Sequence, residues 1–424
     1  MAAHGQSRPG THIHGMEDVF DVVIVGGGLT GPSLALALAD PGLSVALVDA
    51  RPERDRAADD FDGRAYSLAI ASKLLLSAVG VWDAVGDLAE PILRVEAGDG
   101  TGYGPEPPYF LAFDSADLEE GPMGFMLEDR FLYAALAARM RAHPRVRVIT
   151  GQSVVAQCVD GPRATVTLDD GRTLAGRLLV GCDGRGSATA TRAGIARSGW
   201  AYGQTALVCA VEHAIPHQGV ARQLFLAGGP LAMLPLKGGH RSSIVWSEEE
   251  GLAKTIAGLP DDAYLAIVQD RLQGHLGQAT LAGVRFTYPL SLSLASRFIV
   301  KRVALVGDAA HGVHPIAGQG LNLGLRDVGA LAEVLVEATR RGEDIGAVDV
   351  LSRYERWRRS DATLLALGMD AVNRLFSNQN PLLHTARTFG LRAVGSLPGL
   401  RRAFQREAAG LAGDVPRLLS GRPL

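Results

Sequence analysis

Short apolar runs and a glycine-rich turn follow the polar stretch at residues 1–17. Residues 21–25 (DVVIV) and 44–48 (SVALV) are β-branched runs of the kind that form buried parallel strands. Between them, GGGLTG leads into an apolar segment at residues 33–39 that favours a helix. Strand, turn, helix and strand follow one another within about thirty residues, which predicts a βαβ unit.

The later apolar patterns are of two kinds. Helical periods, with apolar residues every three or four positions, occur at residues 64–85, 130–140 and 252–276, and they dominate from residue 321 onward. Strand patterns occur at residues 146–149, 154–158, 164–168, 178–180, 206–211, 223–226, 243–246 and 298–306. The alternation between residues 203 and 250 is typical of an antiparallel sheet, so we expect a second domain there, inserted into a first domain of parallel type.

The first glycine turn carries candidate chemistry. Gly26-x-Gly28-x-x-Gly31 lies between a strand and a helix, and Asp49 ends the next strand, twenty-one residues after Gly28. In a dinucleotide-binding fold such glycines allow a tight turn, the approach of a pyrophosphate and close packing of helix on strand, while the acid binds a ribose. The motif predicts nucleotide binding without separating NAD from FAD, and a turn that merely needs glycine is the alternative.

Two further turns follow buried strands. Residues 182–187 (CDGRGS) contain Asp183, which could also be a simple turn former, and residues 306–327 (VGDAAHGVHPIAGQGLNLGLRD) contain Asp308. The second of these turns opens a helix, whose start offers backbone N–H groups and a positive dipole end to an anion. His311 and His314 have the spacing of a metal pair, but no third ligand follows and Pro315 interrupts the helix, so we expect no metal site.

Composition narrows the classes of function. The 424 residues carry a formal net charge of −3, which argues against a general nucleic-acid binder. The three cysteines lie far apart, without the spacing of a disulfide framework or a metal site, and this fits a reducing compartment. Residues 22–39 lack charge, but their glycines and proline break the continuous helix that a membrane span needs. We expect a cytoplasmic protein with a flexible tail at residues 1–17.

The stretch from His314 to Asp327 resembles the signature of the aromatic-ring flavin monooxygenases, and specifically of the ubiquinone-biosynthesis hydroxylases. The resemblance covers roughly residues 18–415 and includes residues 62–65 (DGRA), 202–205 (YGQT) and 229–236 (GPLAMLPL). It implies an α/β fold with a Rossmann-like FAD-binding domain, an inserted antiparallel-sheet substrate domain and a helical C-terminal region. The FAD-binding domain would comprise residues 18–95, 125–195 and 286–345, and the substrate domain residues 96–124 and 196–285. The helical C-terminal region would comprise residues 346–424.

The resemblance also implies roles for single residues. Asp308 would bind the ribityl chain of FAD, and Arg64 and Arg130 would lie near its phosphates or ring. Asp183 would serve FAD and a transient NADPH site, although the family usually has an arginine three residues after Ser187, where this chain has Ala190. That departure leaves the NADPH contact open. The expected cofactor-binding residues are Gly26, Gly28, Gly31, Asp49, Arg64, Arg130, Asp183, Asp308, Pro315, Gly318, Gln319, Gly320, Leu321 and Asn322.

The implied activity is that of an FAD-dependent NAD(P)H monooxygenase (hydroxylase). NADPH or NADH would reduce FAD, and a flavin hydroperoxide would transfer oxygen to the aromatic ring of a polyprenylated phenol of ubiquinone biosynthesis. The cofactor performs this chemistry, so the protein need not supply a nucleophile, and the sequence names no catalytic residue. Apolar residues of the antiparallel block would wall the substrate site but are equally good core: Leu224, Phe225, Leu231, Met233 and Leu234.

Other functions remain open at this stage. The chain could be a flavin hydroxylase of a soluble aromatic compound, a flavin reductase of prenyl double bonds, or a non-catalytic FAD-bound subunit of a quinone-synthesis complex. The last alternative stays open because Ala190 stands where the family usually has an arginine for the NADPH contact. Residues 371–424 contain eight arginines, two acids and recurring apolar positions. This segment could cap the main domain or dock peripherally on the inner membrane, where a polyprenyl chain resides. Contacts with other quinone-biosynthesis proteins are also expected.

Overall fold

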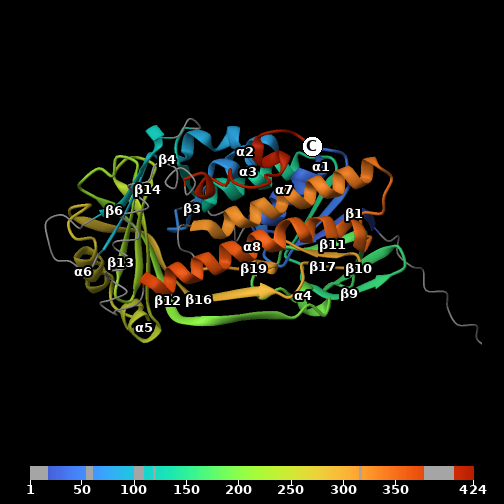
Figure 1. Ribbon diagram of the computed structural model, residues 1–424. Coiled ribbons are helices and arrows are strands. Elements are labelled where there is room, and N and C mark those ends of the chain that lie inside the picture. Colours follow the sequence, from blue (N-terminus) through green and yellow to red (C-terminus); the bar gives the residue numbers. More distant parts are fainter. Residues whose placement is uncertain (1–17, 54–60, 100–108, 118–120, 315–317, 377–404) are drawn as a thin grey trace, which may run out of the picture.

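A computed structural model of the chain describes residues 18–53, 61–99, 109–117, 121–314, 318–376 and 405–424 (Figure 1). One large sheet has a parallel core in the order β18-β11-β1-β2-β8. An antiparallel hairpin, β9 with β10, extends β11, and β17 pairs with β18. The strands are β1 (Asp18–Val25), β2 (Val45–Asp49), β8 (Val146–Thr150), β9 (Val154–Asp160), β10 (Arg163–Leu168), β11 (Thr173–Gly181), β17 (Ile299–Val300) and β18 (Val303–Leu305).

Helices cover one face of this sheet. Val22 and Ile24 of β1 lie in the same apolar cluster as residues of the covering helices, whereas Val23 faces the opposite cluster, formed with the β9–β10 hairpin. This alternation is the period of two that a strand imposes. The helices are α1 (Thr30–Ala39), α2 (Ile70–Ala78), α3 (Asp129–Arg141), α7 (Gln319–Arg340) and α8 (Val348–Phe376), and the short α4 (Ala188–Arg192) follows β11.

The second large sheet has the order β19-β16-β12-β15-β14-β13-β5-β6, and all its neighbours are antiparallel except β13 and β5. Helices α5 (Glu250–Ala257) and α6 (Asp261–Arg271) pack on one of its faces. Its strands are β5 (Arg94–Asp99), β6 (Tyr109–Asp114), β12 (Arg197–His213), β13 (Val220–Leu226), β14 (Gly229–Leu236), β15 (Arg241–Glu249), β16 (Ala279–Ala295) and β19 (His311–Gly312).

A small third sheet joins the two large ones. It has the order β3-β7-β4, with β3 (Ala65–Leu68), β7 (Gly124–Glu128) and β4 (Glu90–Ile92). Single 3-10 turns lie at η2 (Trp82–Ala84), η3 (Gly86–Leu88), η4 (Ser115–Asp117), η5 (Gly307–Ala309) and η7 (Arg417–Ser420). In the described part of the chain, no helix is both long and apolar enough to cross a bilayer.

The mixed α/β class with an antiparallel second sheet is confirmed, and two local expectations are wrong. The helical period expected at residues 64–85 begins with strand β3, because Tyr66 and Ser67 pair with Leu127 and Met126 of β7. The single strand expected at residues 298–306 is the hairpin β17–β18, which turns at Arg302 with φ +59°. The domain limits stay a prediction, and the one at residue 285 falls inside β16.

Candidate functional site

The carboxyl ends of the parallel strands bring the three predicted turns to one edge of the sheet. The N–H of Cys182 donates to the carbonyl of Val25 at 2.7 Å, and the N–H of Val306 donates to the carbonyl of Gly181 at 3.0 Å. The turns after β1, β11 and β18 therefore begin side by side, although up to 280 residues separate them in the sequence. In open α/β sheets, ligands bind at this edge.

The glycines of the first turn meet different surroundings. Gly26 has φ +113°, and a Cβ there would lie 2.3 Å from the carbonyl oxygen of Cys182. A Cβ at Gly31 would lie 2.0 Å from the carbonyl oxygen of Gly26, so α1 packs directly on the turn. A Cβ at Gly28 would meet nothing within 4 Å. Gly26 and Gly31 are thus required by the protein itself, whereas Gly28 leaves space for a ligand.

Asp49 lies directly under the same turn. A Cβ at Gly27 would lie 2.4 Å from Oδ2 of Asp49, and Oδ1 of Asp49 accepts the N–H of Arg51 at 3.1 Å. The middle glycine of the GGG run is therefore needed to let the carboxylate approach. The fingerprint treats this position as arbitrary, so the sequence reasoning missed Gly27, and the run of three glycines was the available signal.

The third turn packs against the first through Thr30. A Cβ at Gly307, which has φ +64°, would lie 3.3 Å from the Thr30 side chain, and one at Gly324 would lie 3.2 Å from Thr30 Oγ1. The start of α1, the turn before Asp308 and the first turns of α7 therefore converge. Neither α1 nor α7 has a side-chain hydrogen bond capping its N-terminus, so both starts can offer N–H groups to an anion.

Two arginines hold Asp308. Arg185 Nε donates to Asp308 Oδ2 at 3.1 Å, and its Nη2 donates to the carbonyl of Val313 at 2.6 Å. Arg197 Nη2 donates to the carbonyl of Asp308 at 3.1 Å, and burial lowers the pKa of Arg197. Arg185 stands in the second motif without an assigned role, and Arg197 lies in no motif, so the sequence reasoning missed both.

The side chain of Asp183 binds the start of the short helix α4, whose N-cap is Ser187. Its Oδ1 accepts Ser187 Oγ at 2.5 Å and its Oδ2 accepts the N–H of Thr189 at 2.9 Å. These bonds agree with the turn-forming alternative for Asp183. Ala190, at the position where an arginine was expected, is wholly buried, and Arg192 donates to the carbonyl of Val154 at 2.6 Å, toward β9.

A buried ion-pair network supports the Gly307 turn. Asp327 Oδ2 accepts the N–H of Gly307 at 3.0 Å and His311 Nε2 at 2.5 Å, and its Oδ1 accepts Arg358 Nε at 2.8 Å. Burial alone would raise the pKa of Asp327, but His311 and Arg358 outweigh it, so the pKa is lowered and the carboxylate stays ionised. His311, considered above only as a metal ligand, instead fixes the turn that presents Asp308.

Asn322 joins the start of α7 to the start of α2. Its Oδ1 accepts the N–H of Ala69 at 2.8 Å and Ser72 Oγ at 2.7 Å, and its Nδ2 donates to the carbonyls of Ser67 at 2.9 Å and Gly318 at 3.1 Å. Gln319, Gly320 and Leu321 form the first turn of α7, and Gly318 precedes it with φ +63°. Pro315 lies outside the described residues.

Arg64 and Arg130 lie around the third sheet. Arg64 Nε donates to Asp62 Oδ2 at 2.7 Å, and its guanidinium lies 5.8 Å from the ring centre of Phe286. Arg130 Nε donates to Glu128 Oε2 at 2.7 Å. The contacts described for these two side chains are with β7, β16, the start of α3 and neighbouring loops, and none is with the three turns. Their expected place at the cofactor stays a prediction.

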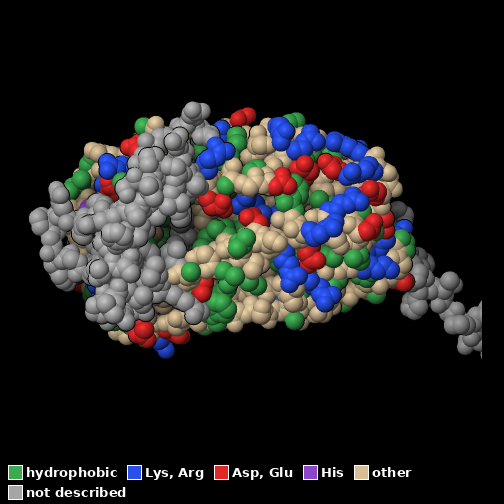
Figure 2. All heavy atoms as spheres, in the orientation of Figure 1, with side chains coloured by type: hydrophobic (Ala, Val, Ile, Leu, Met, Phe, Trp, Pro, Cys, Tyr) green, Lys and Arg blue, Asp and Glu red, His purple; other side chains and the backbone are tan. Residues whose placement is uncertain are grey.

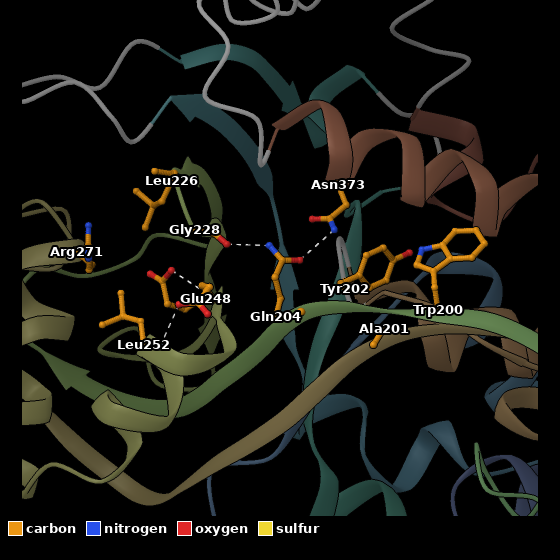
Figure 3. Close-up of a pocket in the computed structure, with 13 residues that line it drawn as sticks. Trp200, Ala201, Tyr202, Gln204, Leu226, Gly228, Glu248, Leu252, Arg271 and Asn373 are labelled. Atoms are coloured by element: carbon orange, nitrogen blue, oxygen red, sulfur yellow. Dashed lines mark hydrogen bonds between the residues drawn. The ribbon is translucent and has the colours of Figure 1, made fainter.

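A cavity of about 970 Å³ lies at one end of the second sheet (Figure 3). Gln204 Nε2 donates to the carbonyl of Gly228 at 2.8 Å, and Asn373 Nδ2 donates to Gln204 Oε1 at 3.1 Å. The Tyr202 ring makes an edge contact with His314, 5.1 Å between ring centres, so the cavity borders the loop that leads into α7. It is lined by Trp200, Ala201, Tyr202, Gly203, Gln204, Leu226, Ala227, Gly228, Glu248, Glu249, Leu252, Arg271 and Asn373.

The alternation of side chains along the strands divides the five apolar residues that could either line the substrate site or belong to the hydrophobic core. Leu224, Leu231 and Met233 lie in the buried cluster formed with α5 and α6, so they are core of the second sheet. Leu234 packs on the opposite face with residues of the third sheet, and Phe225 follows Leu224 and so points away from α5 and α6. Of the five, Phe225 and Leu234 alone lie on the face that looks toward the parallel-sheet domain.

Comparison with known proteins decides the family. Residues 19–366 match the family described as FAD binding domain. The chain is 43% identical to ubiquinone hydroxylase UbiL of Rhodospirillum rubrum, over 96% of this chain and 94% of that protein. It is 34% identical to 3-demethoxyubiquinol 3-hydroxylase of Escherichia coli, over 92% and 98%. The chain belongs to the ubiquinone-biosynthesis flavin monooxygenases.

Solved structures support the fold of this monooxygenase. The p-nitrophenol 4-monooxygenase PnpA from Pseudomonas putida matches with a TM-score of 0.78, at 20% identity, over 94% of this chain and 99% of that one. The resemblance read from residues 314–327 is thereby confirmed, and so are FAD as cofactor and the class of FAD-dependent monooxygenase. The residues present fit the cofactor, because space lies open over Gly28 beside two uncapped helix starts.

Proposed function

We propose that this monooxygenase hydroxylates the aromatic ring of a polyprenylated phenol in ubiquinone biosynthesis, with NADPH or NADH as electron donor. The names of its relatives, a ubiquinone hydroxylase and a 3-demethoxyubiquinol 3-hydroxylase, support the substrate class. The observation that carries the proposal is the cavity beside Tyr202, which borders the loop between Asp308 and α7. When bound, FAD supplies the redox and oxygen chemistry.

The residues of the three turns would hold the cofactor. The start of α1 above Gly28 is suited to the pyrophosphate, and Asp49 to a ribose. Asp308, steadied by Arg185 and Arg197, would bind the ribityl chain. The first turn of α7, from Gln319 to Leu321, would direct its N–H groups toward the flavin ring. Asp327 and Asn322 act through the backbone that they position, because their own polar atoms are used within the protein.

The cavity has the chemistry that a prenylated phenol needs. Trp200, Leu226 and Leu252 supply apolar surface for isoprene units, and the amides of Gln204 and Asn373 supply hydrogen bonds for a phenol. Exclusion of water matters in such a site, because water would divert reducing equivalents away from the ring. The tail of the substrate resides in lipid, so we also propose a cytoplasmic protein that contacts the inner membrane peripherally. The basic segment considered for this contact lies largely outside the described residues.

The test measures NADPH and NADH oxidation by the FAD-loaded protein with and without a prenylated phenol, under labelled oxygen. We expect the phenol to accelerate oxidation and the product to carry one labelled oxygen atom, detected by mass spectrometry. A phenol without the prenyl chain should react more slowly. If it reacted as fast as the prenylated phenol, the alternative of a soluble aromatic substrate would be favoured. Absence of an oxygenated product from prenylated phenols would overturn the proposal in favour of a non-catalytic FAD-bound subunit.

A further inference from the structure

An apolar strip runs along the outer side of the second half of α8. Leu364 is 72% exposed and Leu367 is 47% exposed, and Gly368 and Ala371 are exposed beside them. These four residues, the α8 strip, follow the spacing of three and four that places residues on one side of a helix. Figure 2 shows hydrophobic side chains gathered in the lower middle of this face, over the part of α8 seen in Figure 1.

The charges of α8 are sorted around this strip. Two acids of α8 are engaged within the protein: Glu355 accepts the N–H of Phe298 at 2.7 Å, and the partly exposed Asp361 pairs with Arg358 and Arg326. Asp349 is exposed, but it lies in the first turn of the helix, fifteen residues before Leu364. Arg356 and Arg359 lie exposed toward the helix start. The outer side of the helix therefore presents apolar groups with cations next to them, which is the pattern that suits an anionic lipid surface.

Trp200 links the strip region of α8 to the cavity, because its partner Asp370 lies three residues after Leu367. Trp200 is 40% exposed, lines the cavity, and donates its Nε1–H to Asp370 of α8 at 3.3 Å. Asn373, one turn further along α8, also lines the cavity. Exposed Glu249 lines the cavity and exposed Glu250 follows it, so the apolar surface ends on that side of the cavity. Exposed Trp200 therefore lies between α8 and the cavity, and Figure 3 shows it beside Tyr202, whose ring contacts His314 of the loop before α7.

We propose that the α8 strip rests on an anionic lipid bilayer and holds the cavity mouth at its surface. The inference rests on the proposed function, because the transfer of a polyprenyl tail from lipid to water has an unfavourable free energy for each isoprene unit that becomes exposed. With Leu364, Leu367 and Trp200 in the interfacial layer, the tail passes from lipid into the cavity along apolar surface. Arg356 and Arg359 then face lipid phosphates.

The experiment measures flotation of the full-length, FAD-loaded protein with vesicles of phosphatidylcholine and phosphatidylglycerol. We expect the wild type to float, and the double variant Leu364→Asp, Leu367→Asp to lose about tenfold in partition coefficient per leucine. The variant Arg356→Gln, Arg359→Gln should lose about fivefold per arginine on these vesicles and little on pure phosphatidylcholine. Leu88→Asp, at an exposed leucine of η3, is the matched control and should float like the wild type.

Several outcomes would overturn the inference. The first is that the wild type does not bind the vesicles, and the second is that the double variant floats as well as the wild type. The third is that the wild type is a dimer and the double variant is a monomer, because a second copy of the chain would then cover the strip. If the double variant does not fold, Leu364→Asp alone provides the test at the more exposed position. Turnover of a phenol with one isoprene unit in detergent separates the two proposals. We expect the turnover rate of this phenol to be equal in the wild type and the double variant. If neither protein turned it over, the proposed function would be contradicted, whereas a difference in flotation between them would still support the membrane contact.

Discussion

Single glycines of the first turn have separable roles, and alanine substitutions distinguish them. Gly28→Ala adds a methyl group where nothing lies within 4 Å, so the apoprotein should keep its stability while FAD binding weakens by at least tenfold. Gly31→Ala adds a methyl group 2.0 Å from the carbonyl oxygen of Gly26, so it should lower the free energy of unfolding by about 2 kcal/mol or more. Urea unfolding of the apoproteins and FAD titration check the pair. Equal losses of stability would contradict the assignment of Gly28 to the ligand.

Asp327 is the residue on which the Asp308 turn depends. Asp327→Asn removes the fully buried one of the two carboxylates that pair with Arg358 and should cost about 3 kcal/mol of unfolding free energy. It should also weaken FAD binding, because the N–H of Gly307 loses its anionic acceptor. Asp361→Asn removes a partly exposed partner of the same arginine and should cost at most about 1 kcal/mol. Thermal melts and FAD titrations of the two variants test this, and an FAD affinity unchanged in Asp327→Asn would refute the positioning role.

His314 predicts a pH dependence of stability. Burial, with the nearby charge of Arg185, lowers the pKa of His314 to about 4. The unfolded chain binds this proton near pH 6.5, at the unperturbed pKa, whereas the folded chain stays neutral until about pH 4, so stability is lost as the pH falls between these values. At pH 5 the loss is about 2 kcal/mol relative to pH 7. His314→Gln should flatten the difference between urea unfolding at pH 5 and at pH 7 by that amount, and an identical pH profile in the variant would contradict it.

At the scale of elements, the sequence predicted those helices and strands whose formation depends on nearby residues. The β1–α1–β2 unit was predictable, because its apolar runs and glycines lie within one short stretch. Strand β3 was not, because pairing with β7, some sixty residues later, overrides the helical period of its own residues. For the same reason the three turns were predictable as motifs, while their connections through Thr30, Arg197 and Asn322 required the folded chain.

The junction of α7 and α2 gives a test at this scale. Asn322→Ala removes four hydrogen bonds, of which the three to Ala69, Ser72 and Ser67 span 250 residues or more of sequence, and should cost about 3 kcal/mol of unfolding free energy. The amide of Ala69, which donates to Asn322 Oδ1, should then exchange its hydrogen much faster. Asn322→Asp keeps the acceptor and places its charge at the start of α2, where the helix dipole favours an anion, so the Ala69 amide should stay protected. Equal exchange in both variants would show that the side chain does not join the helices.

At the scale of the whole molecule, the proposed cofactor site connects the two large sheets. Arg185, after β11, donates to the carbonyl of Ser291 on β16 at 3.2 Å, and Arg197 of β12 donates to the carbonyl of Asp308. Strand β16 also pairs with β19, which directly follows the Asp308 turn. The second sheet is therefore connected to the turns that we propose hold FAD, and the α5 and α6 side of the molecule should sense whether FAD is bound.

Removal of FAD tests this connection. FAD at a hundred times its dissociation constant should add about 2.7 kcal/mol to the unfolding free energy, which for a chain of this size raises Tm by about 3 °C. Because the sheets are fastened together, hydrogen exchange of the second sheet and far-UV circular dichroism should report one transition that shifts as a unit. At the same FAD concentration, Gly28→Ala should reduce the shift to about half or less without changing the apoprotein's own Tm. Two separate transitions, of which FAD moves only the one of the parallel sheet, would mean that Arg185 and Arg197 do not couple the sheets.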